Sequence, residues 1–93
     1  MIKMKKNGQK VSVTFTFVPS EEVENVSISG EWNDWKKEPM KKKKNGEFYV
    51  RRSLKAGNTF EFGYVVNDEV WMTDSECPSV PSPFHTQNSL LAL

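Results

Sequence analysis

Residues 11–18 read Val11-Ser12-Val13-Thr14-Phe15-Thr16-Phe17-Val18, an alternation of apolar and hydroxyl-bearing side chains. Because successive side chains of a β-strand point to opposite faces, this period of two predicts a strand with one buried face and one exposed face. Pro19 follows and ends the run, since proline cannot donate a hydrogen bond to a sheet. The clearest pattern in the chain is therefore that of a half-buried antiparallel strand.

The same alternation recurs along the chain between turn residues. The further expected strands are 25–29, the lysine-rich hairpin arm 41–44, 47–54, 60–66, 70–71 and 88–93. Asn45-Gly46 predicts a type I′ hairpin turn, whose two central positions need positive φ. The proline-rich residues 74–87 predict a long ordered loop, because proline does not fit a central strand. About seven strands with turn signals at short intervals predict an all-β fold, an antiparallel β-sandwich of immunoglobulin-like type.

Length and charge limit the organisation and the partners of the chain. We expect one domain over residues 1–93, with residues 1–8 as a flexible N-terminal arm. Thirteen basic and twelve acidic residues give a net charge of +1, which argues against a membrane partner and makes nucleic acid unlikely. Cys77 is the only cysteine, which suits a reducing compartment. No apolar stretch follows the basic N-terminus, so we expect a cytoplasmic protein.

The residue pattern gives no support for catalysis, and we expect no enzymatic activity. Asp74 and Glu76 are too isolated to serve as the paired carboxylates of a glycosidase. One histidine, His85, and one cysteine do not make a metal site, and no phosphate-binding glycine loop is present, so we expect no metal and no cofactor.

Two tryptophans stand close together in the segment Gly30-Glu31-Trp32-Asn33-Asp34-Trp35. Indoles this close on a tight turn cannot easily both point inward, so we expect one of the two to face outward. A flat apolar ring on a polar surface can dock a sugar ring, a nucleobase or a proline-rich peptide. The segment therefore predicts a binding surface.

Several motifs follow one another in a fixed order along nearly the whole chain. They are Gly30-x-Trp32-Asn33-x-Trp35, Pro39-Met40, Gly46-x-Phe48-x-Val50, Leu54-x-x-Gly57, Phe60-x-Phe62-x-Tyr64-Val65-Val66-Asn67, Trp71 and Asn88-Ser89-Leu90-Leu91-Ala92-Leu93. This series resembles the glycogen-binding domains of carbohydrate-binding module family 48. The family includes the module of the β-subunit of AMP-activated protein kinase and the N-terminal early-set domains of isoamylase, branching and debranching enzymes.

The resemblance implies a non-catalytic module that binds an α-glucan of the glycogen or starch type. Trp35 and Trp71 match the two family tryptophans that stack on glucose rings. Asn88 matches the asparagine that hydrogen-bonds sugar hydroxyls, and Thr86 matches a supporting polar residue. Phe84 falls where an apolar loop residue packs against the sugar in kinase-type members.

The chain departs from the family at one key position. Gly63 replaces a lysine that donates to a sugar hydroxyl, and the turn before Trp71 is one residue longer than usual. We expect Arg51 on the preceding strand as a substitute donor. The alternative is an early-set docking module with a degenerate sugar site, associated with a glycoside hydrolase family 13 enzyme or a kinase-like partner. In a third class, the lysine run 41–44 would contact nucleic acid or an acidic partner.

Overall fold

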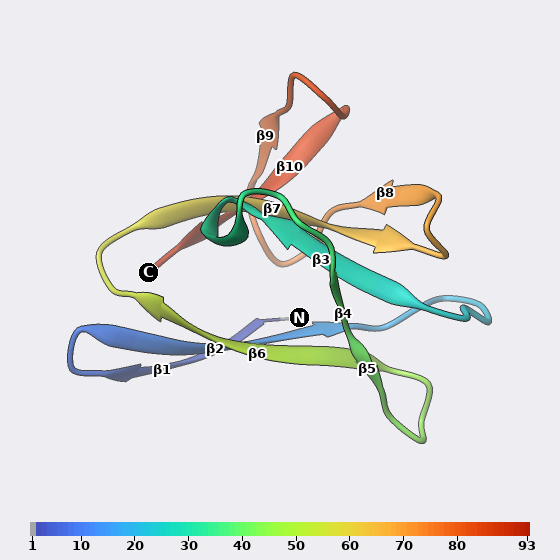
Figure 1. Ribbon diagram of the computed structural model, residues 1–93, viewed down its shortest axis with the longest axis horizontal. Coiled ribbons are helices and arrows are strands. Elements are labelled where there is room, and N and C mark those ends of the chain that lie inside the picture. Colours follow the sequence, from blue (N-terminus) through green and yellow to red (C-terminus); the bar gives the residue numbers. More distant parts are fainter. Residues whose placement is uncertain (1) are drawn as a thin grey trace.

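The computed structural model describes residues 2–93, which form two antiparallel β-sheets packed face to face (Figure 1). One sheet has the order β1-β2-β6-β5; the other has the order β4-β3-β7-β10-β9, with β8 also paired to β7. The elements are β1 (Ile2–Asn7), β2 (Lys10–Phe17), β3 (Val26–Gly30), the 3-10 turn η1 (Glu31–Asn33), β4 (Glu38–Pro39), β5 (Lys41–Lys42), β6 (Phe48–Lys55), β7 (Thr59–Val66), β8 (Val70–Met72), β9 (Ser79–Pro81) and β10 (Gln87–Ala92). The predicted all-β antiparallel sandwich is confirmed. Within residues 2–93, no helix is long and apolar enough to cross a membrane.

The core lies between the sheets and is built from the alternating apolar positions. Val13 and Phe15 of β2 are fully buried, and Phe62 and Tyr64 of β7 meet them from the opposite sheet. The rings of Phe15 and Phe62 lie 5.2 Å apart in an edge-to-face arrangement, which aromatic quadrupoles favour. Because Phe62 and Tyr64 point inward, Gly63 between them faces the outer surface of the six-stranded sheet.

Residues 2–7 form a strand and not the flexible arm expected over residues 1–8. Residues Ile2–Asn7 form β1, which pairs with β2 from Ile2 opposite Phe15 to Asn7 opposite Lys10, while Met1 lies outside the described residues. Gly8 makes the intervening turn with φ of +67°. The sequence conceals this strand because an edge strand is held mainly by backbone hydrogen bonds and needs little apolar alternation.

The proline-rich segment also differs from the prediction of a loop throughout. Its residues Ser79–Pro81 form β9, which pairs with β10 at the edge of the six-stranded sheet. An edge strand tolerates proline because a backbone N–H on its outer side would have no neighbouring strand to donate to. The prediction that this segment holds no central strand is correct.

A hairpin does connect the lysine arm to β6, but its turn is of a different type. Of the two central residues, only Gly46 has positive φ, at +90°, so the type I′ prediction is wrong. The amide of Gly46 donates to the Lys43 carbonyl at 3.0 Å, and the amide of Lys43 donates to the Glu47 carbonyl at 2.7 Å. A longer loop with one left-handed glycine closes this hairpin.

Candidate functional site

The turn after β3 points its two indoles in different directions. Trp32 turns inward and stacks on Phe15 with ring centroids 5.2 Å apart, as expected for a core residue. Gly30 makes room for it, since a Cβ there would lie 2.6 Å from Trp32 Cζ3. Trp35 turns outward and is 37% exposed.

Hydrogen bonds hold Trp35 in an uncommon backbone conformation. Its φ is 63°, in the left-handed region that a bulky residue rarely adopts. The Trp35 amide donates to the Gly30 carbonyl at 2.9 Å, and Ser29 Oγ donates to the Trp35 carbonyl at 2.8 Å. Strained backbone of this kind is found at functional sites, where the surrounding structure fixes a side chain in place.

Glu38 ties the turn to the opposite sheet. Its Oε1 accepts hydrogen bonds from Trp32 Nε1 at 3.2 Å and from Asn33 Nδ2 at 2.6 Å, while Arg52 forms an ion pair with its Oε2. Burial acts to raise the pKa of the Glu38 carboxyl, but the hydrogen bonds from Arg52, Trp32 and Asn33 and the Arg52 charge lower it below its ordinary value. The ionised carboxylate thus keeps the tryptophan-bearing turn in register with β6.

Trp71 of β8 lies flat on the outer surface of β7 at Gly63. A Cβ on Gly63 would lie 2.1 Å from Trp71 Cζ2 and 2.5 and 2.6 Å from Cε2 and Cη2. The added Cβ would be at similar distances from three adjacent ring atoms, which is expected when it lies above the face of the indole and not when it lies beyond the ring edge. The Trp71 ring therefore packs directly on Gly63, and any larger residue at position 63 would displace the ring.

The outward face of Trp71 is covered by His85. The imidazole stacks on the indole with centroids 3.9 Å apart and planes at 8°, and Trp71 Nε1 donates to the Gln87 carbonyl at 2.8 Å. Trp71 is therefore layered between the β7 backbone and an exposed imidazole. The sequence gives no signal for this contact, because thirteen residues, including strand β9, separate Trp71 from His85 along the chain.

The two outer indoles meet. The ring centroids of Trp35 and Trp71 lie 6.3 Å apart with planes at 48°. The turn after β3 supplies one ring and the β7–β8 hairpin supplies the other, where Asn67 and Asp68 adopt positive φ of 52° and 57°. We call Trp35, Trp71 and His85 the aromatic cluster.

Polar groups lie on the same outer face. Asn88 of β10 is 3% exposed and donates through Nδ2 to Glu61 Oε1 at 3.1 Å. Its Oδ1 is buried and has no hydrogen-bond partner within the described residues. Glu31 Oε1 accepts from the Glu61 backbone amide at 2.6 Å, so Glu61 connects a second carboxylate to the site. A buried acceptor without a partner is costly, and a ligand hydroxyl could supply one.

The structure does not bring every predicted site residue into this cluster. Phe84 and Thr86 flank His85 in the loop before β10; both are exposed, Phe84 to 85%. Arg51 lies on β6 of the four-stranded sheet, opposite Thr14 of β2, and its side chain points away from the indoles. It therefore cannot replace the missing lysine.

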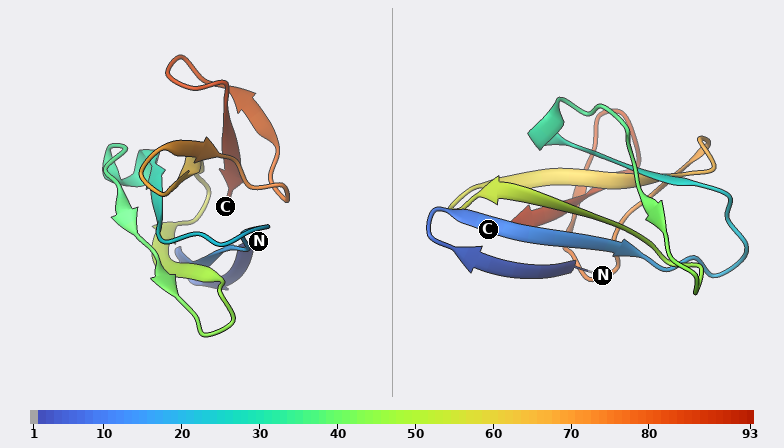
Figure 2. Two further views of the ribbon diagram at one scale, coloured as in Figure 1. Left: turned by 90° about the vertical axis from the view of Figure 1, so that its right-hand side faces the viewer. Right: turned by 60° about the horizontal axis from the view of Figure 1, so that its bottom comes forward.

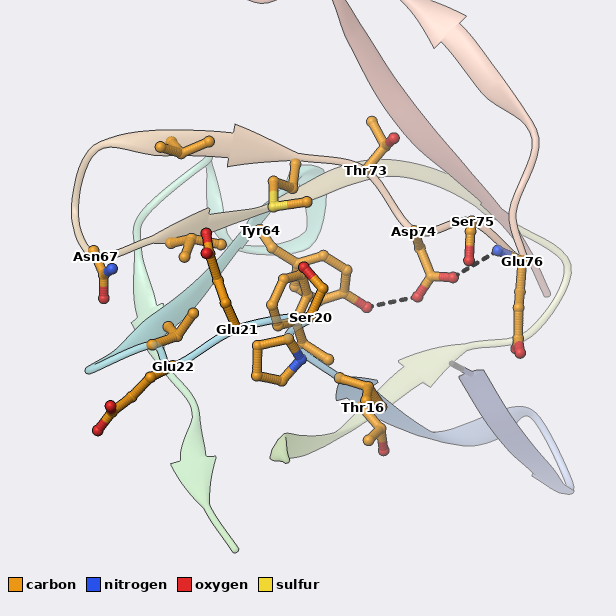
Figure 3. A pocket seen from close by; sticks show the side chains of 17 residues that line it. Thr16, Ser20, Glu21, Glu22, Tyr64, Asn67, Thr73, Asp74, Ser75 and Glu76 are labelled. Carbon is orange, nitrogen blue, oxygen red and sulfur yellow. Dashed lines mark hydrogen bonds between the residues drawn. The ribbon is translucent and has the colours of Figure 1, made fainter. Parts of the chain in front are cut away.

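An open cleft of about 510 Å³ lies elsewhere, at the end of the sandwich between the β2–β3 connection and the segment after β8 (Figure 3). Tyr64 donates to Asp74 Oδ2 at 2.7 Å in this cleft, and the Glu76 amide donates to Asp74 Oδ1 at 2.9 Å. Burial, followed by the charge of Asp74, raises the pKa of the Tyr64 hydroxyl, so it remains a donor. None of the lining residues belongs to the aromatic cluster.

The fold is that of a small β-sandwich domain, and the aromatic cluster lies on the outer face of its six-stranded sheet. The sequence model of the family described as the glycogen recognition site of AMP-activated protein kinase matches residues 11–92, and the chain belongs to this family. It is a carbohydrate-binding module, a class of domain that is generally non-catalytic. A search of characterised proteins gives no match to the chain.

Proposed function

We propose that this module binds an α-glucan chain without cleaving it, by stacking glucose rings on the aromatic cluster. The observation that carries the proposal is the meeting of Trp35 and Trp71, 6.3 Å apart on one outer face. A pyranose ring has C–H groups on its face and hydroxyls around its rim, so an indole covers the former and neighbouring polar groups bind the latter.

The expected affinity is low. If two indoles bury about 200 Å² of apolar surface at about 25 cal/mol/Å², the gross gain is roughly 5 kcal/mol before the loss of translational and rotational freedom. Dissociation constants from about micromolar to millimolar follow. Such binding suits a polymer that presents many equivalent sites.

A sugar reaches Trp71 by displacing His85. Gly63 occupies one face of the indole and the imidazole occupies the other, so a glucose ring stacks there only where the imidazole now lies. The exposed loop that carries His85 can move without disturbing the strands. In place of the family's lysine, Asn88 and the carboxylates of Glu31 and Glu61 bind the hydroxyls, with Asn88 Oδ1 gaining the partner that it lacks.

The test is a calorimetric and fluorescence titration with maltoheptaose, with β-linked cellohexaose as the ligand control. Trp35→Ala should weaken maltoheptaose binding at least about 10-fold, because half of the stacking area is lost. Tyr49→Ala removes an aromatic ring from the other sheet and should leave the affinity unchanged. His85→Ala should strengthen binding about 2- to 10-fold, the value of one aromatic contact. Equal affinities of wild type and Trp35→Ala would contradict the proposal.

A second candidate is a docking module whose sugar site has degenerated. The observation in its favour is that His85 already covers Trp71, while Gly63 supplies no donor. Its partner would be a glycoside hydrolase family 13 enzyme or a kinase-like protein. A flat maltoheptaose titration for both wild type and His85→Ala would favour this candidate, because removing the covering ring would then expose no functional platform.

A further inference from the structure

The basic residues of this chain concentrate in one of its two sheets. The strands of the four-stranded sheet, β1, β2, β5 and β6, contain nine of the thirteen basic residues and none of the twelve acidic ones. The net charge of +1 conceals this separation. A local field, not the total charge, decides whether a surface attracts a polyanion.

Strand register places most of these cations on one side of the sheet. Val13, Phe15 and Val50 point inward, so their neighbours in sequence point outward. The outward and exposed cations, which we call the basic face, are Lys3, Lys5, Lys10, Lys41, Arg51 and Lys55. Within residues 2–93, none of the six forms an ion pair.

Hydroxyl groups lie between these cations in regular rows across the sheet. Lys3, Thr14 and Arg51 form one row, and Lys5, Ser12 and Ser53 form the next. Neighbouring strands are about 4.8 Å apart, and residues on one face repeat every ~6.7 Å along a strand. The face thus presents closely spaced ammonium, guanidinium and hydroxyl donors, the groups that bind phosphate oxygens.

We propose that the basic face docks on a bilayer surface rich in anionic phospholipid. Clusters of four to eight Lys and Arg residues beside a membrane span or on an amphipathic helix bind such surfaces, and the basic face presents six. No strand or helix of residues 2–93 crosses this face (Figure 2). The composition of the basic face does not favour single-stranded nucleic acid, because proteins hold single strands by stacking the bases on exposed aromatic rings. Among the described residues 2–93, Tyr49 is the one aromatic residue on this face, and the Lys43 amine lies 5.3 Å from its ring centroid.

This inference goes beyond glucan binding and does not depend on it. The aromatic cluster lies on the outer face of one sheet and the basic face on the outer face of the other, so the two surfaces point away from each other. A module docked through its basic face would hold the aromatic cluster away from the membrane. Both ligands could then be bound together.

The experiment is co-sedimentation of the full chain with vesicles of phosphatidylcholine alone or mixed with phosphatidylserine. Binding should require phosphatidylserine and should fall steeply with added salt, because the contacts are between exposed charges. Lys10→Glu/Lys55→Glu should weaken binding at least about 10-fold, since each lost lysine removes a contact to the anionic surface. These two residues face each other across β2 and β6, so the double variant preserves a like-charge pair.

Lys36→Glu/Lys37→Glu is the matched control, with the same change in net charge in the turn outside the basic face. Equal loss of binding in the two double variants would overturn the proposal, because net charge alone would then account for the effect. Equal binding to neutral vesicles, or displacement from vesicles by low concentrations of single-stranded RNA, would also overturn it. Circular dichroism checks that each variant is folded.

Discussion

Replacing Gly63 with alanine adds a single methyl group and tests whether the Trp71 ring packs directly on this residue. The indole would have to move outward by at least about 1.3 Å, from 2.1 Å to an ordinary contact of 3.4 Å. That shift disrupts the 2.8 Å hydrogen bond from Trp71 to Gln87, worth about 0.5–1.5 kcal/mol, and the stacking of His85, worth a similar amount. Alanine also restricts the unfolded chain, which stabilises by about 0.4–1 kcal/mol.

The net expectation is a destabilisation of about 1 kcal/mol, or a Tm decrease of about 4–8 °C for a domain of this size. The measurement is a double-mutant cycle: the free energy of unfolding is obtained from urea denaturation of wild type, Gly63→Ala, Trp71→Ala and the double variant. When Trp71 is already alanine, the clash is gone and Gly63→Ala should become stabilising. The same destabilisation in both backgrounds would refute the placement of the indole on Gly63.

The remaining predictions concern the groups with perturbed ionisation. Because folding lowers the pKa of Glu38, the ionised carboxylate stabilises the fold above about pH 4.5, and this stabilisation is lost as the pH falls through the folded pKa. The urea midpoint, measured as a function of pH, should show this loss in wild type but not in Glu38→Gln. At neutral pH, Glu38→Gln should also be less stable than wild type, because it weakens the contact to Arg52. Burial, then the Asp74 charge, raises the pKa of Cys77 to about 11, so alkylation by iodoacetamide at pH 8 should be about 100-fold slower than for a free thiol and should accelerate in urea, as measured by mass spectrometry. Tyr64→Phe leaves Asp74 Oδ2 without this donor and should destabilise the fold by about 1–3 kcal/mol; an unchanged denaturation midpoint would show that the bond is unimportant.

The candidate site was only partly readable from the sequence. The crowding of Trp32 and Trp35 on a short turn predicted that the indoles point in different directions, because both cannot enter one small core. The sequence marked Gly63 only as a departure from the family's lysine, and its contact with the Trp71 ring became apparent only in the folded sheet. The exclusion of Arg51 and the stacking of His85 required the assembled sheets.

The sequence by itself determined the central strands, the two-layer fold and most residues of the core, because alternation is a local property that burial enforces along each half-buried strand. It did not determine the edge strands β1 and β9. The tertiary structure alone decided which surface residues meet. Trp35, Gly63, Trp71 and His85 come from separate turns and strands, and their contacts depend on how β3, β7 and β8 pair. The pairing of β2 with β1 and β6, and of β6 with β5, likewise gathers six cations on one face, although the chain as a whole is nearly neutral.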